Sequence, residues 1–148
     1  MIAPATIRRA TSVCALAAIA CLVAGLAVAQ DPRAAAVQQS ARAWLAQVDR
    51  LDAAASYNAA GEKFRAPITI DAWADALEKA RAPLGAVAQR TLVETAFDRA
   101  APPEGGPEVA IAVLLFRTAF AQRTGGSESV TLALDADGAW RVIGYFIR

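Results

Sequence analysis

The chain has 148 residues, with 15 lysine and arginine residues against 14 aspartate and glutamate residues. It contains no histidine, and its two cysteines, Cys14 and Cys21, both lie near the N-terminus. Beyond that segment the composition excludes a Ser-His-Asp triad, a Cys-His pair and the common structural zinc sites. The nearly balanced charge, without a basic run, also argues against nucleic-acid binding.

Residues 1–29 are typical of a cleavable secretory signal peptide. Arg8 and Arg9 supply the basic end, residues 13–26 form the apolar centre, and an Ala-x-Ala sequence ends at Ala29. We therefore predict cleavage between Ala29 and Gln30, with contact to the membrane only through this leader during export. The product, residues 30–148, is expected to be periplasmic or secreted and is long enough for one domain.

The same segment is open to other interpretations. The apolar run over residues 10–29 could span a bilayer as an uncleaved inner-membrane anchor. Cys21 could carry a lipid, although Ala18 stands where such signals usually have leucine. The Arg8-Arg9 pair could direct twin-arginine export, although the flanking residues fit that signal poorly. Cleavage is favoured because signal peptidase recognises the Ala-x-Ala ending.

The first predicted helix begins at Asp31-Pro32, since aspartate caps a helix and proline fits its first position. Residues at helical spacing form one apolar face, and the opposite face is polar. The members of the apolar face are Val37, Ala41, Trp44, Leu45, Val48 and Leu51.

Two further helices are predicted before the middle of the chain. The second covers residues 53 to about 62, carries Tyr57 and stops near Gly61. The third is capped by Thr69, buries Trp73 and ends at residues 83–85, which contain proline and glycine. These segments make three N-terminal helices in all.

The second half of the chain changes to the pattern of strands, rich in branched and aromatic residues. Four strands are predicted, over residues 87–98, 108–120, 127–136 and 140–147. Turns are expected at residues 102–107, at Gly125-Gly126 and at Asp137-Gly138, so the strands form an antiparallel meander. The second strand is apolar on both faces and is placed centrally. The predicted fold class is α+β, with the helices packed on a bent sheet.

Several short motifs are spread over the predicted helices and strands. They are Ala43-Trp44-Leu45 with Asp49, Phe64-Arg65, Trp73, Arg81-Ala82-Pro83-Leu84-Gly85, and Trp140-Arg141-Val142 with Gly144-Tyr145. Together these motifs resemble a bacterial family of exported proteins, known only as domain of unknown function 4019. The resemblance covers the chain from about residue 36 to residue 148. It implies a cystatin-like or nuclear-transport-factor-2-like fold, in which helices pack into the hollow of a strongly bent antiparallel sheet, and it implies no activity.

A ligand-binding cavity is the first candidate site. Tyr57 and Trp73, with other aromatic residues of the helices, would either line a cavity between the helices and the sheet or simply form the core. Arg65 and Arg81 each adjoin a proline at a corner of the chain. Each arginine would either bond helix-end carbonyls or a local carboxylate, or hold an acidic ligand at the cavity rim. The predicted ligand-binding residues are Arg65, Arg81, Tyr57 and Trp73.

A catalytic site is the second candidate, since carboxylates and two tyrosines, Tyr57 and Tyr145, remain as reactive groups. Glu94, Arg90 and Asp98 alternate along one predicted strand, which is typical of a solvated face. A carboxylate- and tyrosine-dependent lyase or isomerase would need an acidic residue facing an apolar cavity near a tyrosine.

No catalytic residue, metal site or cofactor is predicted. Asp135, Asp137 and Gly138 faintly suggest a calcium loop, but the later ligands are absent and a hairpin turn explains them better. The leading hypothesis is a non-enzymatic envelope module that binds an unknown small molecule or an envelope protein, with the lyase or isomerase as the alternative. Association through an exposed strand edge is a third possibility.

Overall fold

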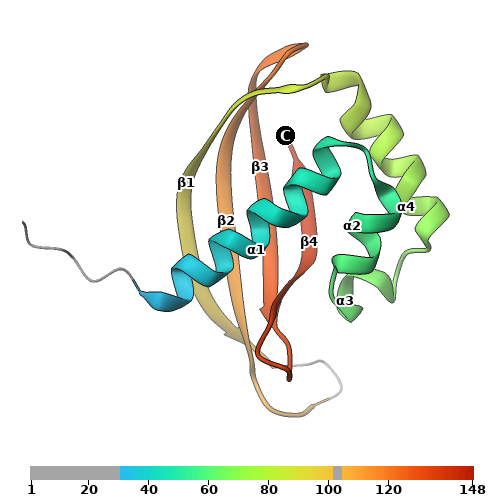
Figure 1. The fold of residues 1–148 in the computed structure, drawn as a ribbon. Coiled ribbons are helices and arrows are strands. Elements are labelled where there is room, and N and C mark those ends of the chain that lie inside the picture. Colours follow the sequence, from blue (N-terminus) through green and yellow to red (C-terminus); the bar gives the residue numbers. More distant parts are fainter. Residues whose placement is uncertain (1–30, 102–104) are drawn as a thin grey trace, which may run out of the picture.

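Helix α1 (Pro32–Asp49) lies across the inner face of a four-stranded sheet in the computed structural model, which describes residues 31–101 and 105–148 (Figure 1). The predicted signal peptide and its cleavage site at Ala29 and Gln30 fall outside these residues. The Asp31 side chain caps the helix by accepting from the Arg33 amide at 2.9 Å. The predicted apolar face is confirmed as the buried one: Val37, Ala41, Trp44, Leu45 and Val48.

Leu51 is the one predicted member of that face that is not buried. The helix ends at Asp49, and Leu51 lies in the following turn with φ of 56° and 44% of its surface exposed. The chain turns here toward α2 (Ala53–Ala59), whose first turn is capped by the Asp52 carboxylate.

The remaining helical segments differ from the two that were predicted. The helix expected over residues 53 to about 62 stops at Ala59, and a separate short helix, α3 (Glu62–Arg65), follows. The break occurs because the Gly61 amide donates to the Val142 carbonyl of the sheet at 2.8 Å. A Cβ at Gly61 would lie 3.3 Å from the Ile143 side chain, so glycine permits this close approach.

The last predicted helix is α-helical only over α4 (Ile70–Ala76). It then widens into a π-helical turn, Leu77–Arg81, and ends in a 3-10 turn, Ala82–Leu84. Turns of the π type are rare and often occur at functional sites.

Strands β1 (Val87–Ala100), β2 (Val109–Phe120), β3 (Arg123–Leu134) and β4 (Trp140–Ile147) form one antiparallel sheet in chain order. The predicted meander and the central position of β2 are therefore confirmed, as is the α+β class. The sheet curves around α1, and α2, α3 and α4 lie beside the β4 edge (Figure 1).

The turn predicted at Gly125-Gly126 is wrong. Both glycines lie inside β3, and the chain reverses earlier, between Phe120 and Arg123. Gly126 is opposite Thr118, where a Cβ would lie 3.2 Å from the Thr118 carbonyl oxygen and 3.3 Å from the Phe120 ring. Gly126 therefore allows a close approach within the sheet, and the two glycines do not form a turn.

A β-bulge in β1 changes which side chains face the helices. The register shifts between Leu92 and Glu94, so that Arg90 lies opposite buried Thr118 while Glu94 lies opposite Leu115 on the other face. The prediction that Arg90, Glu94 and Asp98 share one solvated face is therefore wrong for Arg90, which is half-buried on the inner face. The extra residue of a bulge reverses the alternation beyond it.

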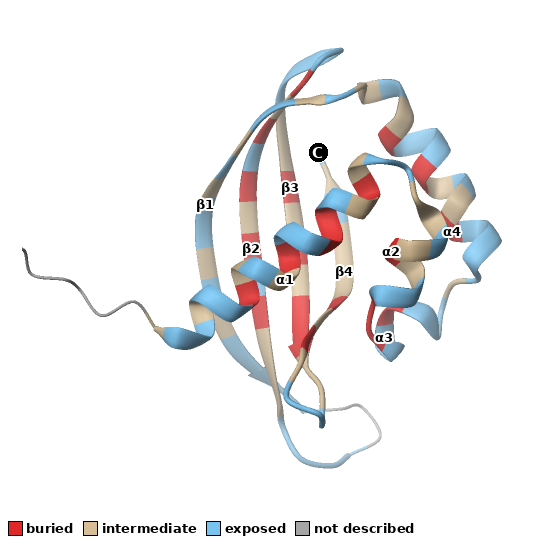
Figure 2. Ribbon diagram, in the orientation of Figure 1, coloured by how far each residue is buried: buried red, intermediate tan, exposed pale blue. Residues whose placement is uncertain are grey.

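The core fills the space between α1 and the inner face of β2, β3 and β4. In Figure 2 the buried positions of α1 face the sheet, and those of the strands alternate with more exposed ones. Phe116, Val130 and Leu132 are fully buried there. Among residues 31–101 and 105–148, no helix is both long enough and apolar enough to cross a bilayer.

Candidate functional site

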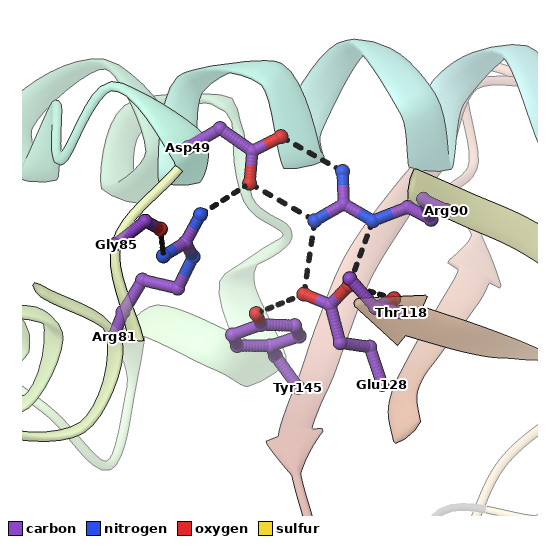
Figure 3. Close-up of polar contacts among 7 residues, drawn as sticks. All are labelled: Asp49, Arg81, Gly85, Arg90, Thr118, Glu128 and Tyr145. Atoms are coloured by element: carbon purple, nitrogen blue, oxygen red, sulfur yellow. Dashed lines mark hydrogen bonds and ion pairs between the residues drawn. The ribbon is translucent and has the colours of Figure 1, made fainter. Parts of the chain in front are cut away.

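Six polar side chains meet at the end of α1 and on the inner face of the sheet (Figure 3). They come from α1, from the π-helical turn and from all four strands, and we refer to them as the polar cluster. Its members are Asp49, Arg81, Arg90, Thr118, Glu128 and Tyr145.

Arg90 lies between two carboxylates in this cluster. Its Nε and Nη2 donate to the two oxygens of Glu128 at 2.7 and 3.0 Å, and its Nη1 and Nη2 donate to those of Asp49 at 2.7 and 2.9 Å. Burial alone would lower the pKa of Arg90, but the hydrogen bonds and charges of both carboxylates raise it. Such paired, charge-assisted contacts hold the guanidinium in one orientation.

Glu128 is fully buried, and each of its carboxylate oxygens accepts two hydrogen bonds. Besides those from Arg90, the Thr118 and Tyr145 hydroxyls donate to it, each at 2.5 Å. Burial, followed by the charge of Glu128, raises the pKa of Tyr145. The pair is a carboxylate near a tyrosine, as the catalytic alternative requires, but the carboxylate is already fully hydrogen-bonded.

Arg81 connects the cluster to the helices and has only 2% of its surface exposed. Its guanidinium donates to the Gly85 carbonyl at 2.6 Å and to Asp49 at 3.1 Å, and it lies over the Phe120 ring with its central carbon 4.7 Å from the centroid. Its Nε, although buried, has no hydrogen-bond partner among the described residues.

A cleft of about 230 Å³ adjoins the polar cluster between the π-helical turn and the end of β4. Arg81 and Tyr145 belong to both the cleft and the cluster, and the rest of the lining is apolar. The lining residues are Trp73, Ala76, Leu77, Ala80, Arg81, Tyr145, Phe146 and Ile147.

Two of the four predicted ligand-binding residues, Trp73 and Arg81, line this cleft, and the other two do not. The Tyr57 hydroxyl instead donates to the Ile68 carbonyl at 2.9 Å and to the Arg65 carbonyl at 3.3 Å, which fastens the segment between α3 and α4. The Arg65 side chain is exposed on α3. The predicted arginine pair is therefore not brought together at one rim.

The aromatic residues of the helices pack mainly against one another. The Trp44 ring centroid lies 5.9 Å from those of Phe64 and Trp73, and the last two lie 5.0 Å apart. These contacts support the interpretation of the aromatic set as core, with Trp73 also reaching the cleft.

Sequence reasoning missed Glu128, although a signal for it was present. The alternation that predicts Val130 and Leu132 as buried also places Glu128 on the same face. A carboxylate on a buried face requires a partner, because an unpaired buried charge is costly.

The β3–β4 hairpin explains Asp135 and Asp137, the two aspartates that faintly suggest a calcium-binding loop in the sequence. Gly138, with φ of 80°, donates its amide to the Asp135 carbonyl at 2.9 Å, as the predicted tight turn requires. Arg141 pairs with Asp135 and Asp137 at 2.8 and 2.6 Å, and its hydrogen bonds lower the pKa of Asp137 to about 2. Both carboxylates are thus engaged by an arginine.

Asp49 makes the stability of the fold depend on pH. Burial alone would raise the pKa of this carboxyl, but the hydrogen bonds and charges of Arg90 and Arg81 outweigh it and lower the pKa below 3.8. A carboxyl whose pKa is lowered by folding stabilises the folded state above its unfolded pKa, and that contribution is lost as the pH falls through the folded pKa. We therefore expect the Tm to fall as the pH drops below about 4.

Thermal unfolding of the wild type and of Asp49→Asn, followed by circular dichroism from neutral to acid pH, measures this dependence. The Asn variant should be less stable at neutral pH and should lose less on acidification. Asp71→Asn, at an exposed position, is the control and should keep the wild-type profile. An equally steep loss in the Asp49 variant would contradict the assignment.

Comparison with known proteins gives a match to a family model. No curated protein and no solved structure matches the chain. A family model described as "Protein of unknown function (DUF4019)" matches residues 40–145. That range includes the whole polar cluster and all of the cleft except Phe146 and Ile147. The chain therefore belongs to the DUF4019 family.

Proposed function

We propose that residues 30–148 are an exported, non-enzymatic binding module whose ligand is an apolar molecule or an apolar segment of an envelope protein. The ligand occupies the cleft between the π-helical turn and the end of β4. The observation that carries the proposal is the character of this cleft, whose lining is apolar apart from the Arg81 and Tyr145 side chains.

The geometry of Glu128 favours binding over catalysis. A general base needs a free lone pair and access to its substrate. Glu128 is fully buried, and its four hydrogen bonds use both oxygens. The lyase or isomerase alternative would require this carboxylate to leave Arg90, which is held on its other side by Asp49.

The proposed location rests on the sequence, and the proposed shape rests on the curvature of the sheet. The basic and apolar leader with its Ala-x-Ala ending supports export to the bacterial periplasm or beyond. The curved sheet with α1 on its inner face (Figure 1) supports a cone of the cystatin-like or nuclear-transport-factor-2-like kind, with the cleft beside the end of β4. In such a cone, the cleft is the natural entrance for a ligand.

A neutral apolar fluorophore, N-phenyl-1-naphthylamine, tests the cleft. We expect it to bind the full-length protein with a rise in its fluorescence. Ala80→Phe should weaken binding by about tenfold or more, because the ring occupies the cleft beside Trp73 (roughly 1.4 kcal/mol). Ala80 is exposed, so the substitution should leave the fold intact.

Ala72→Phe is the matched control, because Ala72 is an exposed alanine of α4 outside the cleft lining. It should bind the fluorophore as the wild type does. The proposal fails if the wild type does not bind the fluorophore, or if both phenylalanine variants bind it equally well.

A further inference from the structure

One wall of the cleft is the edge of a strand rather than its face. Successive side chains of a strand point to opposite faces of the sheet. Tyr145, Phe146 and Ile147 are consecutive, yet all three line the cleft. That is possible because β4 is the last strand in the order β1-β2-β3-β4, so its outer edge borders the cleft.

The hydrogen-bond pattern identifies which main-chain groups point outward from this edge. Ser127 and Arg148 exchange both of their amide–carbonyl bonds at 2.9 Å, and Ser129 is opposite Phe146. Facing pairs of an antiparallel ladder alternate, so the amides and carbonyls of Phe146 and Arg148 point to β3. Those of Tyr145 and Ile147 point away from β3, toward the cleft, and no described residue bonds to them.

The same edge already accepts a main-chain partner further along the strand. There the Gly61 amide donates to the outward carbonyl of Val142 at 2.8 Å. The chain itself thus covers the first part of the β4 edge and leaves Tyr145 and Ile147 open beside the cleft.

The opposite wall of the cleft belongs to the helices. It carries the small residues Ala76 and Ala80 on α4 and the π-helical turn, with Trp73 at one end. A strand added to a sheet lies about 4.8 Å from its neighbour and places alternate side chains on each face. Apolar side chains of such a strand would contact Trp73 and the two alanines.

The opposite edge of the sheet is less suited to such a partner. Strand β1 has two register irregularities and carries Arg90 on its inner face, and both features discourage the pairing of an edge strand. Among the residues that the structure describes, no helix forms a wall opposite that edge that could contact the side chains of an added strand (Figure 1).

We infer that the cleft binds an extended peptide segment with alternating apolar residues, which adds to the sheet beside β4. Its main chain exchanges hydrogen bonds with Tyr145 and Ile147, and its apolar side chains enter the cleft. The inference rests on the proposed function and narrows its ligand from any apolar group to a protein segment.

A phage-displayed library of random heptapeptides, selected against the full-length protein, provides the probe. For a selected peptide, methylating the amide nitrogens of one alternate set of residues should weaken binding by about tenfold or more, and methylating the other set should not. With peptide bound, amide hydrogen exchange at Tyr145 and Ile147 should slow by about tenfold or more, while Phe146 should change little. Ala80→Phe should abolish binding, and Ala72→Phe should retain it.

The outcomes separate this inference from the proposed function. If no peptide is selected but N-phenyl-1-naphthylamine binds in the cleft, the inferred strand addition is wrong and the proposed binding of an apolar ligand is retained. A peptide that binds equally well with either set of amides methylated, or without protecting Tyr145 and Ile147, would also overturn it. If neither probe binds, both proposals fail.

Discussion

Replacing Glu128 with alanine is expected to lower the free energy of unfolding by about 3–5 kcal/mol, the usual cost of removing one partner of a buried ion pair. The substitution leaves the side of Arg90 that faced Glu128 without an acceptor, and it removes the acceptor of the Thr118 and Tyr145 hydroxyls. Thr118 is fully buried, so water cannot readily replace the lost partner. Urea denaturation followed by circular dichroism measures the change.

Two variants serve as controls for this prediction. Glu128→Gln keeps the volume and one acceptor oxygen, but its amide nitrogen cannot accept from Arg90 or from the hydroxyl on its side, that of Thr118 or of Tyr145, so its loss should be intermediate. Glu108→Ala removes an exposed carboxylate whose contact with Arg99 is 4.0 Å, and it should change stability by less than about 0.5 kcal/mol. A loss below about 1 kcal/mol for Glu128→Ala would show that the cluster contributes little.

The polar cluster explains how α1 can end in an aspartate. The C-terminus of a helix carries partial negative charge, so a carboxylate there is unfavourable. Asp49 is the last residue of α1, and two arginines, Arg81 and Arg90, offset this repulsion. The same contacts fix the end of α1 to the sheet and to the π-helical turn, and they thereby set one side of the cleft.

Much of the fold could be predicted from local patterns. Helical spacing gave the buried face of α1, and the Asp137-Gly138 turn gave the β3–β4 hairpin. The errors occur where a contact distant in sequence overrides the local pattern. Gly61 breaks a helix because it bonds to β4, and Gly126 lies in a strand because it packs against Thr118.

The site was harder to predict than the fold. Of the four predicted ligand-binding residues, Trp73 and Arg81 line the cleft, whereas the Tyr57 hydroxyl bonds to main-chain carbonyls and the Arg65 side chain is exposed. Arg90 could not be placed, because a bulge reverses the alternation of β1 and leaves no clear mark in the sequence. The cleft itself depends on a π-helical turn and a strand edge that only the packing brings together.

The second large effect is expected for Trp44→Ala, with a loss of about 3–5 kcal/mol in the free energy of unfolding. Trp44 is buried on α1, and its ring contacts those of Phe64, Trp73 and Tyr145, with the Tyr145 centroid at 5.2 Å. Its Nε1 donates to the Ser56 carbonyl at 2.8 Å. One side chain thus joins α1 to the other helices and to β4. Its removal leaves a cavity and takes away one of the two donors to the Ser56 carbonyl, the other being the Ala60 amide.

Trp44→Phe separates these two contributions. It keeps an aromatic ring but loses the hydrogen bond to Ser56, so its cost should be smaller, about 1–3 kcal/mol. Urea denaturation gives both values, and a loss below about 1 kcal/mol for Trp44→Ala would contradict the role of this ring.

Trp44→Ala should also weaken the binding of N-phenyl-1-naphthylamine under conditions where the variant remains folded. The reason is that Trp73 and Tyr145 line the cleft and both pack against Trp44. Unchanged binding in the folded variant would mean that the cleft keeps its shape without support from α1.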